Sequence, residues 1–497
     1  MLRRLLISGA LAASLTAALT LSPVAGASAP PTAKQRETLQ RYAAATWRSF
    51  VAMTNEQTGL TADNINADTR ARAAYTSPTN IAAYIWSTIA ARELGIISAS
   101  EARNRVDQTL DTLATMERSH GFYYNWYDPA TGKKLTIWPV NGDKIDPFLS
   151  SVDNGWLAAA LMMVRTAMPA LAASAEALLE PMNFGFFYNP AEGQLRGGYW
   201  PEGTTQCNVN GFTCHHYGTL NTEPRIASYI GIAAGDIPPE HYFRMFRTFQ
   251  PTCDWSWQEM QPAGVTRTYL GVSVYEGHYT YRGMNIVPSW GGSMFEALMV
   301  PLLVPEASWG PSSWGVNHPL YVRAQIEHGL EDADYGYWGF SPSNDPSGGY
   351  REYGVDPIGL NPDGYFSDEE KTPVDYGFDS CPGRETQSIP TDYGNGVVTP
   401  HASFLALQYA PQEALRNLRQ LRQDFDAYAW GGFLDAINVG TGQVSRYYLA
   451  LDQGMVMFAL ANELTGYRFQ HYFSDQIEAQ IRPLLAIEEF TAGTAAP

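Results

Sequence analysis

The chain has 497 residues, of which only 16% are charged and 13% are aromatic, and its formal net charge at pH 7 is −18. A chain this acidic offers no general phosphate-binding surface, so we expect no nucleic-acid partner. The 13 Trp and 29 Tyr residues suit a protein that stacks sugar rings, although a large aromatic core would give the same composition.

The first residues have the pattern of a secretory signal peptide. Arg3 and Arg4 precede an apolar run, which ends in small residues at Ala25, Ala27 and Ala29. This order predicts bacterial export with cleavage after Ala27, which leaves residues 28–497 as one secreted domain, expected to be a monomer. No later apolar run is long and smooth enough to span a bilayer.

Four cysteines fit an oxidising compartment. Cys207 and Cys214 frame a short loop that a local disulfide could close, and Cys253 and Cys381 would then form a long-range pair. Since four cysteines allow three pairings, the sequence alone leaves the others open. A zinc site at Cys214 and His215–His216 is conceivable, but adjacent histidines rarely chelate one ion together, and we expect no metal.

Helical spacing of apolar residues dominates the rest of the chain. After an opening helix at Ala33–Thr54, mostly apolar helices alternate with amphipathic ones. The apolar helices are predicted at Pro78–Gly95, Val152–Arg165, Glu223–Ala234, Ser293–Val304, Pro400–Tyr409 and Leu451–Leu464. The amphipathic helices are predicted at Ala99–Arg118, Met168–Glu180, Pro239–Phe249, Pro319–Asp332, Pro411–Tyr428 and His471–Glu488.

Helices that are apolar on all sides belong in the interior, and amphipathic helices belong on the surface. The alternation therefore predicts an all-α fold, an (α/α)6 barrel in which helical hairpins close into a ring. An irregular bundle or an open solenoid is the alternative. In such a ring the inner helices run in one direction, so their N-terminal ends share one mouth.

Polar residues stand at these N-terminal ends, at Asn80, Asp153, Glu223, Glu296, His401 and Asp452. Each could be a helix cap. Asn221 or Thr222 is the predicted cap of the third apolar helix, with Pro224 in its first turn, and Glu223 could merely complete that cap. Three long loops rich in aromatic residues, Asn and Asp are predicted to lie over the mouth, at Ser119–Leu149, Pro181–Leu220 and Asp334–Val397.

The chain lacks a GxSxG elbow, a glycine-rich phosphate loop and an HExxH zinc motif. Carboxylates gathered at one mouth among aromatic residues suit glycoside hydrolysis instead. That reaction needs one carboxylic acid to protonate the leaving oxygen and a second carboxylate as nucleophile or base. We expect no cofactor.

Nine blocks carry a resemblance to a known family, among them GFYYNWYDPATGK, SVDNG, TEPRIASYIGIAAGDIP, SWGGSMFEALMVPLLV, TPHASFLAL and LDQGMVMFALANEL. In this order, from Ala43 to Tyr467, the chain resembles the glucoamylase-like family. That family includes bacterial endo-β-1,2-glucanases and, more remotely, the transglycosylase domain of cyclic β-1,2-glucan synthases. The resemblance implies an (α/α)6 barrel that hydrolyses a β-glucan, β-1,2-glucan first, with inversion.

The resemblance also implies roles for individual residues. Glu223 matches the family's general acid, and Asp153, Asp435 and Asp452 match acidic positions among which the base stays open. Substrate-binding candidates are Trp126, Tyr127, Glu296, Trp338, Tyr350, Arg351 and His401. Pro342 stands where the cyclic-glucan relatives carry a glutamate, so retaining transglycosylation is not expected.

The expected partner is therefore a polysaccharide or oligosaccharide substrate. Two alternatives stay open from the sequence. The chain could be an exo- or endo-hydrolase of another cell-envelope glycan, or an inactive glycan-binding barrel.

Overall fold

The computed structural model describes residues 30–253, 260–360, 393 and 396–494. Helix α1 (Ala33–Met53) opens the chain, and two alternating sets of helices follow. The first set is α2 (Pro78–Glu93), α4 (Ser151–Ala167), α6 (Arg225–Ala234), α8 (Met294–Leu298) with its continuation α9 (Val300–Leu303), α12 (Pro400–Leu405) and α14 (Ala450–Thr465). The second set is α3 (Ala99–Thr115), α5 (Ala172–Leu179), α7 (Glu240–Arg244), the short α10 (Glu306–Trp309), α11 (Trp314–Glu327), α13 (Pro411–Asp424), α15 (His471–Ser474) and α16 (Glu478–Ile487).

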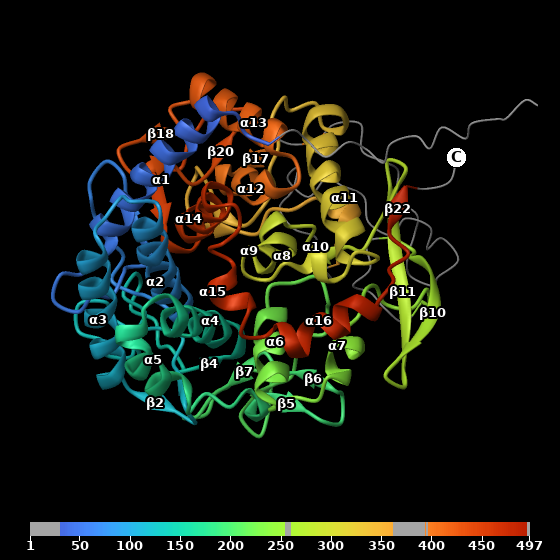
Figure 1. The fold of residues 1–497 in the computed structure, drawn as a ribbon, viewed down its shortest axis with the longest axis horizontal. Coiled ribbons are helices and arrows are strands. Elements are labelled where there is room, and N and C mark those ends of the chain that lie inside the picture. The colour runs from blue at the N-terminus through green and yellow to red at the C-terminus, as the bar shows by residue number, and fades with distance from the viewer. Residues whose placement is uncertain (1–29, 254–259, 361–392, 394–395, 495–497) are drawn as a thin grey trace, which may run out of the picture.

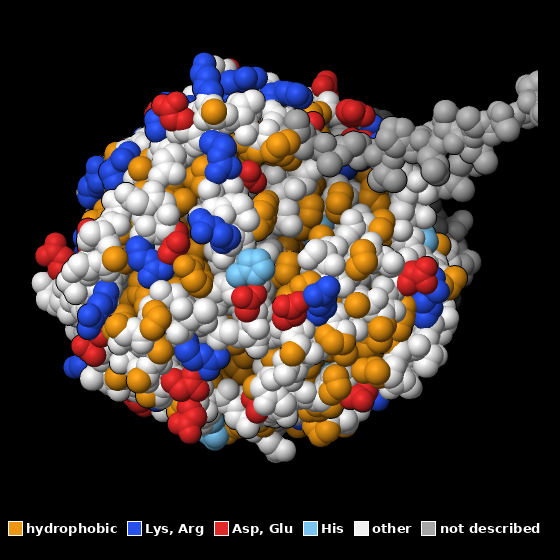
Figure 2. Space-filling model, in the orientation of Figure 1, with side chains coloured by type: hydrophobic (Ala, Val, Ile, Leu, Met, Phe, Trp, Pro, Cys, Tyr) orange, Lys and Arg blue, Asp and Glu red, His pale blue; other side chains and the backbone are white. Residues whose placement is uncertain are grey.

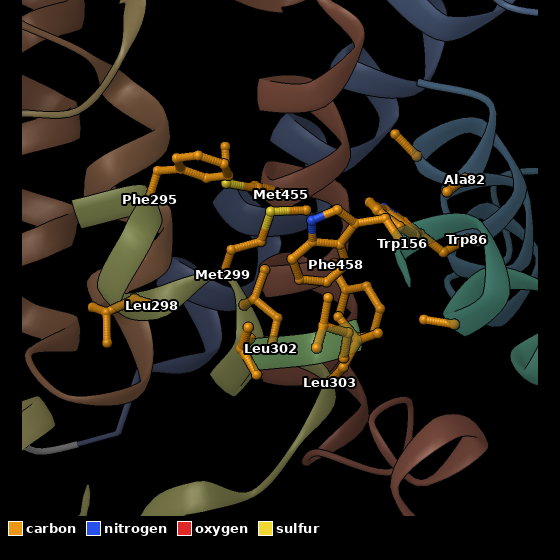
Figure 3. Close-up of a cluster of buried hydrophobic side chains, with 14 of the residues drawn as sticks. Ala82, Trp86, Trp156, Phe295, Leu298, Met299, Leu302, Leu303, Met455 and Phe458 are labelled. Carbon is orange, nitrogen blue, oxygen red and sulfur yellow. The ribbon is translucent and has the colours of Figure 1, made fainter. Parts of the chain in front are cut away.

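The first set forms the interior, as their composition predicted. Every residue of α2 from Pro78 to Ala91 is buried, whereas α13 buries a single stripe that includes Leu418 and Leu421. Figure 3 shows the centre of the core, where α2, α4, α8, α9 and α14 meet. There the ring of Trp86 packs edge-on against Trp156 and Phe458, at centroid distances of 6.2 and 6.0 Å.

The inner helices contact one another in chain order. Helix α2 packs between α14 and α4, α4 packs on α6, and α12 packs between α8 and α14. Hydrogen bonds also join their N-terminal ends: Thr79 of α2 donates to Asp153 of α4, and the N–H of Ala450 in α14 donates to the carbonyl of Asp63 ahead of α2. Figure 1 shows α3, α5, α11 and α13 around the periphery. The N-terminal ends of the inner helices therefore lie on one side.

A four-stranded antiparallel sheet was not predicted. It consists of β10 (Ala263–Tyr269), β11 (Val272–Tyr281), β12 (Met284–Ile286) and β22 (Gly493–Thr494), and its hairpin stands at one edge of the molecule (Figure 1). Leu270 and Gly271 make the β10–β11 turn with φ values of 48° and 79°, as a two-residue hairpin turn requires. The pattern was missed because apolar and polar residues do not alternate along β11.

Short strand pairs connect the helices. They are β1 (Asn64–Asn66) with β21 (Tyr447–Leu449), β2 (Arg118–Ser119) with β3 (Phe122–Tyr123), β5 (Tyr188–Asn189) with β6 (Gln194–Leu195), β13 (Ser289–Trp290) with β16 (Gly359–Leu360), β14 (Ser343–Asn344) with β15 (Tyr350–Arg351), β17 (Val397–Val398) with β20 (Ile437–Asn438), and β18 (Tyr428–Ala429) with β19 (Gly432–Phe433). A second four-stranded sheet has the order β4 (Leu149–Ser150), β7 (Gly198–Tyr199), β9 (Phe212–Thr213) and β8 (Asn208–Val209).

Several predicted outer helices have different bounds, and the predicted helix His471–Glu488 is broken into α15 and α16. Helix α7 ends at Arg244 rather than near Phe249. Helix α11 begins at Trp314, so Pro319 lies inside it rather than at its start. The extra first turn is anchored by buried polar side chains, because Asn317 bonds the backbone of Val287 and His318 bonds Glu306.

Cys207 and Cys214 form the predicted local disulfide, which closes the β8–β9 hairpin. The second predicted pair involves Cys381, and the predicted signal peptide covers residues 1–27; both lie outside the described residues. Within the described ranges no single helix is long and apolar enough to cross a membrane, and one pair that passes together, Ser151–Ala167 with Pro169–Phe186, is bent by 119°. Figure 2 shows basic and acidic side chains interspersed on the face it presents.

Candidate active site

Glu223 lies in the turn that leads into α6. Neither Asn221 nor Thr222 caps this helix, which begins at Arg225 with Pro224 at the cap position and no side-chain cap. The predicted cap is wrong because Thr222 donates its hydroxyl to Glu296 instead, at 2.5 Å. The Glu223 carboxylate accepts the indole N–H of Trp156, from α4, at 2.6 Å.

Arg225, the first residue of α6, holds this turn in place. Its guanidinium is fully buried and forms a bidentate pair with Glu306, with N–O distances of 2.8 and 3.0 Å. Its remaining donors bond the carbonyls of Thr222, Glu296 and Ala297 at 2.8–3.1 Å. One buried cation therefore sets the backbone on both sides of the two glutamates. Sequence reasoning missed Arg225, although a lone arginine in an apolar helix requires a buried partner.

Glu296, in the first turn of α8, faces Glu223. One of its oxygens accepts both the Thr222 hydroxyl and the backbone N–H of Glu223, the latter at 2.9 Å. Burial and the neighbouring Glu296 carboxylate raise the pKa of Glu223 well above its ordinary value, against the hydrogen bond from Trp156. A carboxyl whose pKa is raised in this way is suited to proton donation.

Both glutamates open onto a large cavity of about 920 Å³. Its wall includes Tyr217 and His215 beside the disulfide, Phe246 after α7, Tyr275 of the β11 strand and Trp290. Aromatic side chains with a few convergent polar groups are typical of a ligand site. The volume and lining are sufficient for an oligomeric ligand whose hydroxyls meet carboxylates and whose ring faces meet aromatic residues.

Another pair of carboxyls lies at the N-terminal end of α14. Asp435 and Asp452 are each only 2% exposed, and they lie close enough to share a hydrogen bond. The backbone N–H of Asn344 donates to Asp435 at 2.6 Å. Burial raises the pKa of Asp435 to about 6, and burial with the Asp435 charge raises the pKa of Asp452 well above its ordinary value. This pair holds one proton more readily than two isolated carboxyls would.

His401, from α12, lies beside this pair, with Nδ1 3.5 Å from Asp452. The potential ligand atoms of His401, Asp435 and Asp452 lie within 4.8 Å of one another, a spacing that a cation could use. However, the Thr399 hydroxyl donates to the Asp435 carbonyl, so His401 Nδ1–H must donate to Thr399. In the neutral imidazole Nε2 then carries the lone pair, so the Ser341 hydroxyl, which also accepts the N–H of Phe295, donates to Nε2.

Both nitrogens of His401 are thus engaged in a neutral tautomer, and no lone pair is free for a metal. Burial accordingly lowers the pKa of His401 to about 3. The residues present fit a proton-sharing carboxyl pair with a supporting histidine better than they fit a metal centre.

Two further aspartates, Asp153 and Asp63, lie near the N-terminal ends of the inner helices. Asp153 accepts the hydroxyl of Thr79 at 2.6 Å, while Ser150 rather than Asp153 caps α4. Asp63 accepts the side-chain amides of Asn80 and Asn64 at 2.8 and 3.0 Å. Burial raises the pKa of both aspartates, and their charges interact. Asp63 was missed because it stands in a loop with no periodic pattern; only its packing against α14 brings it to the mouth.

Two family models and a curated relative match this chain. Residues 262–475 match the Glycoamylase family model, described as “Putative glucoamylase”, and residues 41–216 match another model, of proteins of unknown function. The cyclic β-(1,2)-glucan synthase NdvB of Rhizobium meliloti is 24% identical over 88% of this chain, which spans only 18% of that relative's length. Over residues 262–475 the chain is therefore similar to the glucoamylase-like family.

Solved structures show the same fold over nearly the whole chain. The endo-β-1,2-glucanase from Chitinophaga pinensis has a TM-score of 0.64 at 17% identity, with 90% of this chain and 98% of that chain covered. The β-1,2-glucanase from Parabacteroides distasonis has a TM-score of 0.65 at 16% identity, with 92% and 60% covered. At sequence identities this low, the structural similarity shows the fold alone.

The remaining candidates of this glucoamylase-like chain occupy different environments. Tyr127 and Trp338 are buried in the core, at 0 and 2% exposure, and the Tyr127 hydroxyl donates to the backbone of Glu117. Neither ring offers a face to a ligand. Trp126 is half-buried and packs edge-on against Tyr75 and Trp138, at 5.6 and 5.2 Å.

Tyr350 and Arg351 lie on β15, which pairs with the strand that carries Asn344. The Tyr350 side chain is 53% exposed, yet its hydroxyl end faces Asp452, Asp435 and Glu223. Arg351 is exposed and lies 3.9 Å from Asp345. The structure therefore places Tyr350 near the acids. His401 lies beside Asp452, and Glu296 accepts the backbone N–H of Glu223.

Proposed function

We propose that this protein is an exported glycoside hydrolase that cleaves a β-linked glucan, β-1,2-glucan first, within an (α/α)6 barrel. The observation that carries the proposal is the environment of Glu223. Its carboxyl is enclosed by Trp156 and Glu296, has a pKa raised well above its ordinary value by burial and the Glu296 charge, and still lines a large aromatic cavity.

Glu223 acts as the general acid, delivering its proton to the glycosidic oxygen as the bond to the anomeric carbon breaks. The indole of Trp156 holds one oxygen of this carboxyl, and Glu223 lines the cavity. The Asp435–Asp452 pair supplies the base. One of its two carboxyls is ionised above about pH 6 and takes a proton from the attacking water, with Asp153 as the competing candidate.

Substrate contacts follow from exposure. Tyr350 reaches toward the acids on both sides, and Tyr217, Phe246, Tyr275 and Trp290 present rings to the cavity for stacking on pyranose faces. The names of the structural neighbours, a β-1,2-glucanase and an endo-β-1,2-glucanase, and of the cyclic β-(1,2)-glucan synthase relative support the same choice of linkage.

Product analysis tests the proposal directly. The protein is incubated with β-1,2-glucan, with other β-glucans and with arabinan-type polymers, and the released oligosaccharides are measured. Cleavage of β-1,2-glucan is expected, with the rate falling about 10²–10⁴-fold in Glu223→Gln while oligosaccharide binding persists. Cleavage of a different glycan would replace the substrate, and a wild-type protein that binds but cleaves none would identify a binding module.

A further inference from the structure

Glu296 lines the cavity and also accepts a hydrogen bond from the backbone of Glu223. It is 8% exposed, and a single oxygen accepts two donors, the Thr222 hydroxyl at 2.5 Å and the Glu223 N–H at 2.9 Å. A carboxyl oxygen that accepts two donors is stabilised in its ionised form. Glu223, in contrast, accepts one described donor, the Trp156 indole.

The two glutamates therefore differ in how well their charged forms are supported. Two neighbouring carboxylates in a buried site repel each other, so ionising both is unfavourable. The carboxyl whose charged form accepts more hydrogen bonds ionises first. The Arg225 guanidinium also bonds the carbonyls of Thr222 and Glu296, which locks the spacing between the two side chains.

We propose that Glu296 is a positioning residue that remains ionised and, by its charge and its hold on the Thr222–Glu223 backbone, keeps Glu223 in the protonated, proton-donating form. This inference rests on the proposed role of Glu223 as general acid. Glu296 itself does not touch the bond that breaks.

Other charged groups face the pair and set the background. Glu223 also faces Asp153 of α4 and Arg225 of α6, which act in opposite directions on its pKa. Burial raises the pKa of Glu296 as well, but the hydrogen bonds from Thr222 and Glu223 and the Arg225 charge lower it, while the charge of the exposed Glu352 adds to the rise. Because these groups remain in place in a Glu296 variant, a change in Glu223 titration reports on Glu296.

The variant Glu296→Gln tests this, since an amide oxygen can still accept both hydrogen bonds but carries no charge. The pH profile of kcat/KM on β-1,2-glucan is measured. Glu223 must be protonated to donate, so its titration forms the alkaline limb. Loss of the neighbouring negative charge should move that limb to lower pH by about one pH unit. Thr222→Val, which removes one donor to Glu296, should move it in the same direction by less.

Asp332→Asn is the matched control. Asp332 also accepts two hydroxyls, from Tyr281 and Tyr393, but lies after α11, and its loss should leave the limb in place. A Glu296→Gln protein that loses kcat equally at all pH values, with an unmoved limb, would show a merely structural role and overturn the inference.

Infrared spectroscopy gives a measurement that does not depend on turnover. Difference spectra, with Glu223→Gln as the subtraction, follow the Glu223 carboxyl through its titration in wild type and in Glu296→Gln. The expected result is a lower midpoint in the variant. An unchanged midpoint refutes the role of Glu296, whereas an inactive wild type with the expected midpoint shift refutes only the proposed hydrolysis.

Discussion

Replacing Arg225 by Met should destabilise the fold by about 3–5 kcal/mol, because the change leaves Glu306 buried with an unpaired charge. Arg225 and Glu306 are both fully buried, and two N–O contacts of 2.8 and 3.0 Å join them. Tyr229 and His318 also bond Glu306, at 2.7 and 3.0 Å, but neither supplies a full positive charge. The lost bonds to three backbone carbonyls add to the cost.

Urea unfolding followed by tryptophan fluorescence measures this loss. The double variant Arg225→Met/Glu306→Gln should recover part of the stability, since it removes both charges together. Burial alone would raise the pKa of Glu306, but the Arg225 charge and the hydrogen bonds outweigh it and lower the pKa to about 2. The pair's contribution should therefore be complete above the ordinary carboxyl pKa of about 4.5 and disappear as the pH falls toward 2. A loss below about 1 kcal/mol in Arg225→Met, or a double variant no better than the single, would refute this account.

The remaining predictions concern the base, the disulfide and Glu276, a buried glutamate of β11. The Asp435–Asp452 pair should set the acid limb of kcat/KM near pH 6, below which the base is protonated, and Asp452→Asn should move or abolish that limb in the measured profile. Replacing Cys207 and Cys214 by Ser should lower the unfolding free energy by about 2 kcal/mol and raise KM, because Cys214 lines the cavity; calorimetry and kinetics check both. Burial raises the pKa of Glu276 to about 7, so stability should decline as the pH rises from about 4.5 through 7, and Glu276→Gln should be more stable at pH 8 by up to about 3 kcal/mol in urea unfolding.

The inner helices could be predicted because burial on all sides leaves a direct mark on sequence. A helix such as α14, with residues from Ala450 to Asn462 almost all buried, has few polar positions to obscure its period. The β10–β11 hairpin left no such mark. Its outer strand exposes most of its residues, including Val265 at 47%, and its inner strand is buried over several consecutive residues without strict alternation.

The acids divide in the same way. Glu223 and Asp452 could be placed at a common mouth because they begin helices whose direction the barrel pattern fixes. Asp63 and Trp156 could not, since Asp63 sits in an irregular loop and Trp156 has the sequence surroundings of an ordinary core residue. The carboxylate that Trp156 bonds comes from a turn 67 residues away in sequence, and only the packing of α4 on α6 brings the two groups together. Tyr127 shows the converse, because a residue in an aromatic-rich loop proved to be core.

The site contains two buried carboxyl pairs, and their supports differ in a way that favours opposite roles. In the Glu223–Glu296 pair, Glu223 accepts one hydrogen bond and Glu296 accepts two, so the charged form of Glu223 is the less stabilised of the two. The proton that the pair retains is therefore on Glu223, which lines the cavity and can donate it to a leaving group. In the Asp435–Asp452 pair, Asn344 stabilises the charge on Asp435, so an ionised carboxylate remains available above about pH 6. Environments that push paired titratable groups apart are how one mouth holds both an acid and a base at a single pH. Burial and the charges of Asp452, Asp435 and Glu223 raise the pKa of the Tyr350 hydroxyl, so this side chain interacts with both pairs.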